Sequence, residues 1–406
     1  MERTGFADLP LHPGVAPKWL FERMVKLGRE IINVIIEEWG PDEFIKRIAD
    51  PVWFQSLGTV LAFDWNSSGL TTILTAALKE AVRDREKDLG IFICGGKGKT
   101  SRKTPTEIER WGRVLSLSKT GVDNLIYNSK MTAKVDGALV QDGFQIYHHS
   151  FFFSRDGAWT VVQQGMNINN QTARRYHWYS KKINDLVCEP HSGIVSQIKT
   201  PTLNLTARES KDNQKISTEL VQGSYSGLMK DIEILRKHSS ELSRMITLRF
   251  TPHHFYRPSS IRKPLTRKSG AGFKEKKATL LHLENKEFNW HPVLLENFSK
   301  SRYLEKILAR VCQRKPENYE KLLSLEGVGP KTIRALSLVS EVIYGAKPSY
   351  EDPARYSFAH GGKDGTPYFV DRGTYDETIN FFQRVVRKMK IPISEKNKIM
   401  IKLNKF

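Results

Sequence analysis

The chain has 406 residues, and its 64 Lys and Arg outnumber its 44 Asp and Glu, which gives a formal net charge of +20. This length suffices for two or three domains with a real core, and the charge favours a polyanionic partner. The three cysteines, Cys94, Cys188 and Cys312, are too far apart for a disulfide framework or a zinc knuckle. The chain shows neither a signal-peptide pattern nor an apolar run long enough to cross a bilayer, so we expect a cytoplasmic protein without a membrane partner.

Residues 1–56 are expected to form an irregular opening followed by helices. The stretch at residues 4–14 is rich in Pro and Gly, which favours loop structure. A helix is predicted over residues 17–38.

Residues 57–250 are expected to form an α/β domain that begins with a βαβα unit. The pattern predicts a buried strand over residues 57–63, a helix over 69–86, a strand over 91–94 and a helix that starts at Thr104. A right-handed crossover would make the two strands parallel. Asp64 and Lys97 then emerge at the same carboxyl edge of the sheet, where the sites of open α/β sheets lie.

A glycine-rich basic stretch follows the strand at residues 91–94. Its basic side chains and the next helix N-terminus would form an anion trap, and these side chains are Lys97, Lys99, Arg102 and Lys103. The spacing does not complete a Walker A loop, so we favour nucleic-acid phosphate over a nucleoside triphosphate. The alternative is a mobile basic loop without a ligand.

A β-hairpin is expected later in the same domain. Strands are predicted over residues 134–141, 144–153 and 158–164, with Asp156-Gly157 as a two-residue turn between the last two. This loop length places His149 opposite Gln164. The predicted fold class is therefore α/β, with a βαβα unit, a β-hairpin and a helical C-terminal domain.

Polar residues accumulate between residues 136 and 191 beyond the needs of a structural hairpin. Their oxygen and imidazole donors suit a divalent metal, magnesium or manganese, and the candidate ligands are Asp64, Asp142, His149, Glu189 and His191. For phosphodiester hydrolysis the candidate catalytic residues are Asp64, Lys97, His149 and Glu189. Near Arg174 and Arg175, the aromatic side chains of Trp159, Tyr176 and Trp178 would stack on exposed bases. The alternative is that they are core aromatics and that the two arginines are a solvated charge pair. No spacing matches a specific metal motif, and the alternative is a hydrogen-bonded core.

The last part of the chain changes in composition. Residues 251–288 are rich in Pro, Ser, Gly and basic residues, which predicts a linker or a basic surface loop. Residues 289–406 are expected to form a helical domain.

A small-residue turn at residues 323–332 lies between two apolar helical patterns. Gly327 and Gly329 allow a tight turn whose lack of side chains lets a phosphate approach the backbone. Lys331, Thr332 and the N-terminus of the following helix would then hold the anion. The turn resembles the helix-hairpin-helix motif of DNA repair proteins, which implies a grip on the DNA backbone without reading of sequence. The alternative is an αα-hairpin that only packs.

The same turn allows a second chemistry. In base-excision glycosylases that also cut at abasic sites, a lysine of the hairpin attacks the sugar and an aspartate assists. Lys331 and Asp352 stand near those positions, so the resemblance implies these roles for them. Two features argue against this glycosylase chemistry: no iron-sulfur cysteines follow the turn, and Pro353 comes directly after the aspartate.

Five runs carry a resemblance over nearly the whole chain, at residues 4–12, 63–69, 95–99, 161–167 and 352–365. Together they resemble the archaeal and bacterial family called domain of unknown function 763. The resemblance implies a prokaryotic cytoplasmic protein and supplies no activity. Asn66 stands where many relatives are expected to have histidine.

These observations lead to three hypotheses. The first is a DNA-binding protein of DNA repair or processing that acts as a metal-dependent nuclease. The second is a DNA glycosylase or abasic-site lyase, and the third is a DNA-binding protein without activity. RNA remains a possible partner because phosphate contacts do not separate it from DNA, and the sequence does not determine an oligomeric state.

Overall fold

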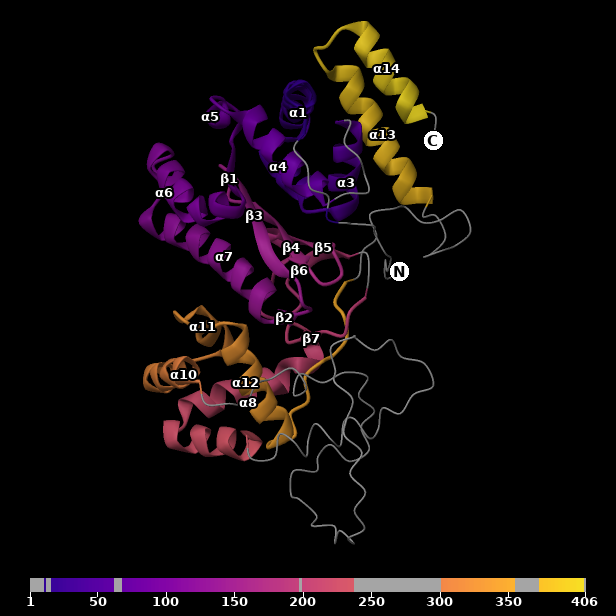
Figure 1. The fold of residues 1–406 in the computed structure, drawn as a ribbon. Coiled ribbons are helices and arrows are strands. Elements are labelled where there is room, and N and C mark those ends of the chain that lie inside the picture. The colour runs from indigo at the N-terminus through magenta and orange to yellow at the C-terminus, as the bar shows by residue number, and fades with distance from the viewer. Residues whose placement is uncertain are drawn as a thin grey trace, which may run out of the picture. The chain divides into compact units, whose positions relative to one another are not determined.

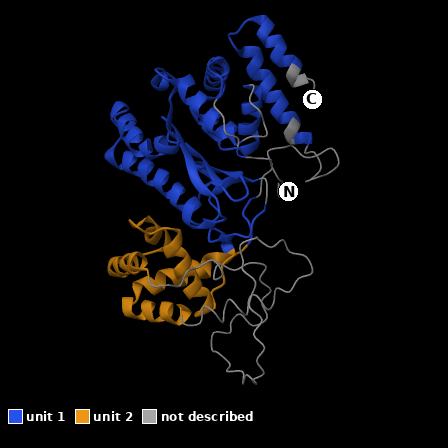
Figure 2. Cartoon of the chain, in the orientation of Figure 1, with its two compact units in different colours: residues 1–208, 351–406 blue, residues 209–350 orange. Residues whose placement is uncertain are grey.

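The structure is a computed structural model, and it describes residues 11, 16–61, 68–196, 199–236, 301–354 and 372–404. The packing of the chain divides it into two compact units, shown in Figure 2: unit 1 holds residues 1–208 and 351–406, and unit 2 holds residues 209–350. The division departs from the predicted consecutive domains, because the chain returns to unit 1 after residue 350. The predicted linker at residues 251–288 lies outside the described residues.

Unit 1 begins with helices whose ends follow local sequence signals. They are α1 (Lys18–Trp39), α2 (Pro41–Ile48), α3 (Pro51–Val60), α4 (Gly69–Val82) and the short α5 (Glu86–Leu89). Gly40 separates α1 from α2 with a φ of 83°, and Pro41 then starts α2. Asp50 caps α3 by accepting hydrogen bonds from the amides of Val52 and Trp53 at 2.8 and 3.2 Å. The helix predicted over residues 17–38 is confirmed as α1.

The predicted βαβα unit is wrong at its first strand. Residues 57–60 of the predicted strand lie in α3. Most residues of α3 are buried, so the helix is as apolar as a buried strand, and a short apolar run does not separate the two structures. The second predicted strand is confirmed as β1 (Ile91–Lys97), but it pairs with an antiparallel neighbour.

The centre of unit 1 is a five-stranded sheet in the order β1-β3-β4-β5-β6. The strands after β1 are β3 (Gln145–Ser154), β4 (Trp159–Asn167), β5 (Thr172–Tyr179) and β6 (His191–Ser196). Every neighbouring pair is antiparallel, so the predicted parallel crossover is wrong. A separate ladder joins β2 (Val140–Gln141) to β7 (Leu203–Asn204).

The predicted β-hairpin is confirmed, but with a different register. The amide of Ser154 donates to the carbonyl of Ala158 at 2.9 Å and closes a three-residue loop whose last member, Gly157, has a φ of 93°. This loop replaces the predicted two-residue turn and shifts the pairing by one residue. His149 therefore lies opposite Gln163.

Helices cover both faces of the sheet, as Figure 1 shows. α6 (Thr104–Val114) and α7 (Lys119–Ala138) lie on one face, and α3 and α4 lie on the other. α7 also takes up most of the strand predicted over residues 134–141, of which residues 140–141 are extended. The polar and apolar side chains of the sheet are thus enclosed between two helical layers.

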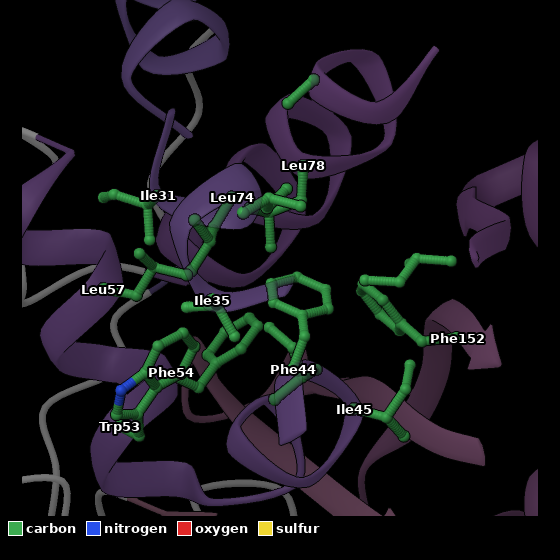
Figure 3. Close-up of a cluster of buried hydrophobic side chains, with 14 of the residues drawn as sticks. Ile31, Ile35, Phe44, Ile45, Trp53, Phe54, Leu57, Leu74, Leu78 and Phe152 are labelled. Carbon is green, nitrogen blue, oxygen red and sulfur yellow. The ribbon is translucent and has the colours of Figure 1, made fainter. Parts of the chain in front are cut away.

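The main hydrophobic core lies between the sheet and the helices α1 to α4. Figure 3 shows Phe44, Trp53 and Phe54 from the helices beside Phe152 from β3. The core also includes α13 (Arg372–Lys388), which is followed by α14 (Ile393–Asn404). Phe382 of α13 stacks on Trp53 with 5.8 Å between ring centroids.

Unit 2 is built from helices. They are α8 (Lys211–Gln222), a helix over residues 225–236, α10 (Arg302–Arg314), α11 (Tyr319–Ser324) and α12 (Pro330–Val342). α8 packs closely on α12 through small polar side chains. Asn213 Nδ2 donates to the carbonyls of Ser337 and Ala346 at 3.0 and 2.7 Å, and Ser217 and Ser340 contact each other at 3.0 Å. In the described ranges of both units, no helix is long and apolar enough to cross a membrane.

Candidate functional site

Polar side chains occupy the centre of the sheet on both of its faces. On the face under α3 and α4, His148, Gln164 and Arg175 follow one another across β3, β4 and β5. On the face under α7, His149 and Gln163 form a second row. All five side chains are at most 5% exposed. Because cross-strand neighbours on one face lie within side-chain contact, each row is a continuous polar cluster inside the protein.

The aromatic side chains that were predicted either to stack on bases or to pack in the core are packed in the core. Tyr176 and Trp178 are 0% exposed, and Trp159 is 7% exposed. Arg174 and Arg175 are 0% exposed as well, so the predicted solvated charge pair is wrong. These side chains are therefore part of the interior of unit 1.

A hydrogen-bonded chain links Ser129 on α7 to Asp136 through two residues of the sheet. His149 Nε2 lies 2.9 Å from Ser129 Oγ, and its Nδ1 lies 2.9 Å from Gln163 Oε1. Gln163 Nε2 donates to Asp136 Oδ2 at 2.5 Å and to the carbonyl of Thr132 at 3.2 Å, which fixes the orientation of the amide. These partners assign the proton of His149 to Nδ1, so Nε2 accepts from Ser129. Burial lowers the pKa of His149 and keeps the ring neutral.

Asp136 joins this chain to His191 on the edge strand β6. His191 Nε2 lies 2.5 Å from Asp136 Oδ1, while Gln163 and Trp178 donate to Oδ2 at 2.5 and 3.0 Å. The carboxylate acts as an acceptor for all three side chains and therefore fixes the tautomer of His191. With its proton on Nε2, His191 keeps Nδ1 as the basic nitrogen. Its side chain is 8% exposed.

Asp142 and Asp352 enclose Arg174 in a buried ion triad. Arg174 Nη1 lies 2.8 Å from Asp142 Oδ2, and Nη2 lies 2.7 Å from Asp352 Oδ2, with all three side chains at most 4% exposed. Tyr176 donates its hydroxyl to Asp142 at 2.7 Å. Burial alone would lower the pKa of Arg174, but the charges of the two aspartates raise it above its ordinary value. Burial raises the pKa of Asp142.

The described candidates for a metal site do not converge. Asp142, His149 and His191 are held in the separate hydrogen bonds given above, and Glu189 pairs with an exposed arginine at 2.8 Å. Within the described part of the chain, no group of three or more His, Cys, Asp and Glu side chains is arranged to hold a metal ion. The fifth predicted ligand, Asp64, which was also a catalytic candidate, lies outside the described residues. Register and packing send the described members of the predicted cluster to different partners.

The glycines of the basic stretch serve the packing of the sheet. Gly95 has a φ of 86°, and a Cβ at this position would lie 2.3 Å from the carbonyl oxygen of His149 on β3. Glu107 accepts hydrogen bonds from the amide of Gly95 at 2.8 Å and from Lys79 Nζ at 2.6 Å. Lys79 also donates to the carbonyl of Gly95 at 3.0 Å. The base of the stretch is therefore held firmly in place.

The basic side chains that follow lie on the surface. They continue from the end of β1 into the 3₁₀ helix η1 (Gly98–Lys103), which has no acidic residue in its first turn. The exposed side chains are Lys97, Lys99, Arg102 and Lys103. The four predicted phosphate contacts are thus on one short segment of the surface of unit 1.

The turn between α11 and α12 has the geometry that its glycines predict. Gly327 has a φ of +84°, and a Cβ there would lie 2.4 Å from Ile307 Cδ1. Gly329 is the N-cap of α12, and a Cβ added there would meet no heavy atom of the described chain within 4 Å. The first turn of α12 has neither a side-chain cap nor an acidic residue, and Lys331 is exposed. The start of α12 therefore combines free space at Gly329 with an exposed cation and an uncapped first turn.

Two other residues predicted for this region have structural roles. Thr332 is 3% exposed, so its side chain packs inside unit 2. Asp352 belongs to unit 1, where it also accepts hydrogen bonds from the amides of Thr200 and Ala354 at 2.7 and 2.9 Å. Together with Arg174, these donors occupy both oxygens of the carboxylate.

Comparison with protein families matches residues 5–370 to the family described as protein of unknown function (DUF763). The chain belongs to this family. The DUF763 match spans unit 2 and nearly all of unit 1 up to α13, so the buried rows and the glycine turn both fall within it. No curated protein and no solved structure gives a significant match. The function of this DUF763 protein must therefore be argued from its own residues.

Some side chains of the buried rows escaped the sequence reasoning. Ser129 and Gln55 contact the rows from α7 and α3, and no local motif marks either of them. Arg174 and Asp352 are 178 positions apart, and no spacing rule connects them. A polar residue in an otherwise apolar face of a helix is the one signal that points to such partners.

Proposed function

We propose that this protein binds DNA through its phosphate backbone, with the turn between α11 and α12 as the main contact. The observation that carries the proposal is the open N-terminus of α12. Its N-cap Gly329 leaves room for a ligand, its first turn lacks an acidic residue, and Lys331 is exposed beside it. A helix N-terminus of this kind attracts a phosphate through its free amides and its dipole. The likeness to the helix-hairpin-helix motif supports the same proposal.

Unit 1 supplies a second basic surface. The segment with Lys97, Lys99, Arg102 and Lys103 is exposed and carries no counter-charge in its first helical turn. The net charge of +20 favours association with any polyanion. Contacts of this type grip the backbone and do not read bases, so we propose binding that depends little on sequence and strongly on salt.

The test is the binding of a labelled duplex by fluorescence anisotropy at several salt concentrations. Lys331→Gln should weaken binding roughly tenfold, about 1.4 kcal/mol, and lower the slope of log K against log salt by about 0.9. Lys230→Gln removes another exposed lysine of unit 2 and should change neither quantity. Gly329→Ala should weaken binding with little loss of stability, because the added methyl group meets only the ligand. Equal effects of both lysine variants would refute a specific role for the turn.

A second candidate function is hydrolysis of the bound strand, and the pair of Asp136 and His191 favours it. The carboxylate holds His191 so that Nδ1 can accept a proton from an attacking water. The water oxygen would bond to phosphorus as the bond to the leaving sugar oxygen breaks, and the sugar oxygen would take a proton from solvent. The described residues offer no metal site, so a requirement for magnesium or manganese is a question for the assay.

Labelled single-stranded, duplex, flap and abasic DNA would be incubated with and without each metal and resolved on denaturing gels. His191→Gln should reduce cleavage by about a hundredfold or more and leave binding unchanged, which is the effect of losing a general base. Cleavage retained in this variant would remove His191 from the mechanism. Cutting at abasic sites alone, with a covalent complex trapped by borohydride, would instead support Lys331 as an amine nucleophile.

A further inference from the structure

Two neighbouring arginines of β5 are equally buried but differently neutralised. Arg174 lies between two carboxylates at 2.8 and 2.7 Å. Arg175 is also 0% exposed, and its guanidinium contacts the neutral oxygens of Gln55 at 3.2 Å and Thr71 at 3.4 Å. Among the residues that the structure describes, no carboxylate forms an ion pair with Arg175. A buried charge is destabilising unless it is paired. An anion bound beside Arg175 would therefore stabilise this cation.

The surroundings of Arg175 leave one donor of its guanidinium without a partner among the described residues. The ring of Phe54 covers one face of the guanidinium at 4.7 Å from the centroid. Its Nε has no hydrogen-bond partner among the described residues. Burial lowers the pKa of Arg175 to about 9, so the side chain is still mostly charged at neutral pH.

The two residues next to Arg175 in the row carry unused polar atoms as well. Gln164 pairs with Arg175 across β4 and β5, and His148 pairs with Gln164 across β3 and β4. Gln164 Oε1 and His148 Nδ1 have no partner among the described residues, and both side chains are 0% exposed. The amide of Gln164 is oriented by its Nε2, which donates to the carbonyl of Ser68 at 2.8 Å and to Tyr147 Oη at 2.5 Å.

The row thus combines a cationic donor with a neutral acceptor on one face of the sheet. Arg175 attracts an anion, and Gln164 Oε1 requires a hydrogen-bond donor. A phosphate group that keeps one proton has both properties, since it is negatively charged and has an O–H to donate. Sulfate has the charge and the shape but no proton at neutral pH.

We propose that His148, Gln164 and Arg175 form a buried binding site for a phosphate group that retains one proton. The phosphate is either free or the terminal group of a nucleic acid strand. For free phosphate, the site is independent of the proposed DNA binding. If the ligand is a strand end, the proposed site rests on the proposed function. It then defines the substrate class as nucleic acid with a terminal phosphate.

The test is thermal unfolding of the full chain in chloride buffer at neutral pH, with inorganic phosphate or sulfate added at equal ionic strength. Phosphate should raise the unfolding temperature in proportion to the logarithm of its concentration, and sulfate should bind at least tenfold more weakly. Arg175→Met should abolish the phosphate response, while the exposed Arg113→Met control should keep it. No phosphate response in the wild type, or an equal response in Arg175→Met, would overturn the proposal.

A second variant covers the case in which Arg175→Met does not fold. Gln164→Met keeps the size of the side chain and removes the acceptor, so it should weaken phosphate binding about tenfold and abolish the preference over sulfate. Isothermal titration of the wild type with inorganic phosphate gives the affinity directly. A preference for phosphate that survives in Gln164→Met would overturn the role of the proton.

The two sources of the phosphate are separated by competition. A 5′-phosphorylated oligonucleotide that displaces inorganic phosphate from the wild type, where its 5′-hydroxyl counterpart does not, identifies the strand end as ligand. Displacement by neither oligonucleotide identifies free phosphate. Lys331→Gln distinguishes this site from the proposed function, because weaker DNA binding with an unchanged phosphate response shows that the two are separate.

Discussion

Replacing each of the two buried arginines by methionine tests most directly how the pairing of buried charges contributes to the stability of unit 1. Arg174→Met keeps most of the apolar stem but leaves Asp142 and Asp352 buried beside each other without a cation. Removing one partner of a buried pair costs about 3–5 kcal/mol. For a unit of this size, such a loss lowers the unfolding temperature by roughly 6–20 °C. Arg175→Met removes a charge that has no described counter-charge, so we expect stability to be unchanged or raised.

The pH dependence of Arg174→Met follows from the same carboxylates. Burial raises the pKa of Asp142, and the loss of Arg174 removes the charge that opposes this effect. A carboxyl with a raised pKa in the folded state binds a proton more readily there than in the unfolded chain. Its contribution is therefore favourable at low pH and lost as the pH rises through the folded pKa. The destabilisation of Arg174→Met should be smaller in mild acid than at neutral pH.

Urea unfolding followed by tryptophan fluorescence measures both variants. Every tryptophan except Trp290 falls within the residue ranges of unit 1, so the signal reports mainly on that unit. A loss below about 1 kcal/mol in Arg174→Met would contradict the ion triad as a source of stability. An equal loss in both variants would show that the volume of the side chain matters more than neutralisation.

Two further predictions concern His148 and the glycine turn. Burial lowers the pKa of His148 from 6.5 to about 3, so acid should destabilise unit 1 as the unfolded chain takes up the proton. At about pH 5, one and a half pH units below 6.5, the free energy of unfolding should be lower by about 2 kcal/mol. Urea unfolding of His148→Gln should show a correspondingly weaker dependence on pH. Gly327→Ala should cost about 1–3 kcal/mol, because alanine disfavours a φ of +84° and its Cβ would clash with Ile307, whereas Gly329→Ala should cost less than about 1 kcal/mol in the same thermal unfolding experiment. Equal losses in the two glycine variants would contradict the assigned geometry.

The amino-acid sequence by itself determined the features that depend on near neighbours. The helix over residues 17–38, the strand at residues 91–94, the β-hairpin and the glycine turn were all predicted from periodicity and turn residues. The family was also predicted from short runs of sequence, and the match over residues 5–370 confirms it. These features follow from the backbone preferences of a few adjacent residues, which act before any tertiary contact forms.

The tertiary structure decided which polar residues meet. Residues 57–60 lie in α3, whose residues are mostly buried, and an apolar run alone does not distinguish a buried helix from a buried strand. The loop that ends at Gly157 has one residue more than predicted. This additional residue sets the register of the hairpin and places His149 opposite Gln163. The ion pair of Arg174 with Asp352 joins residues 178 positions apart, and the lack of such a partner for Arg175 among the described residues is visible only after folding. Neutralisation of a buried charge depends on distances through space, and sequence spacing does not fix those distances.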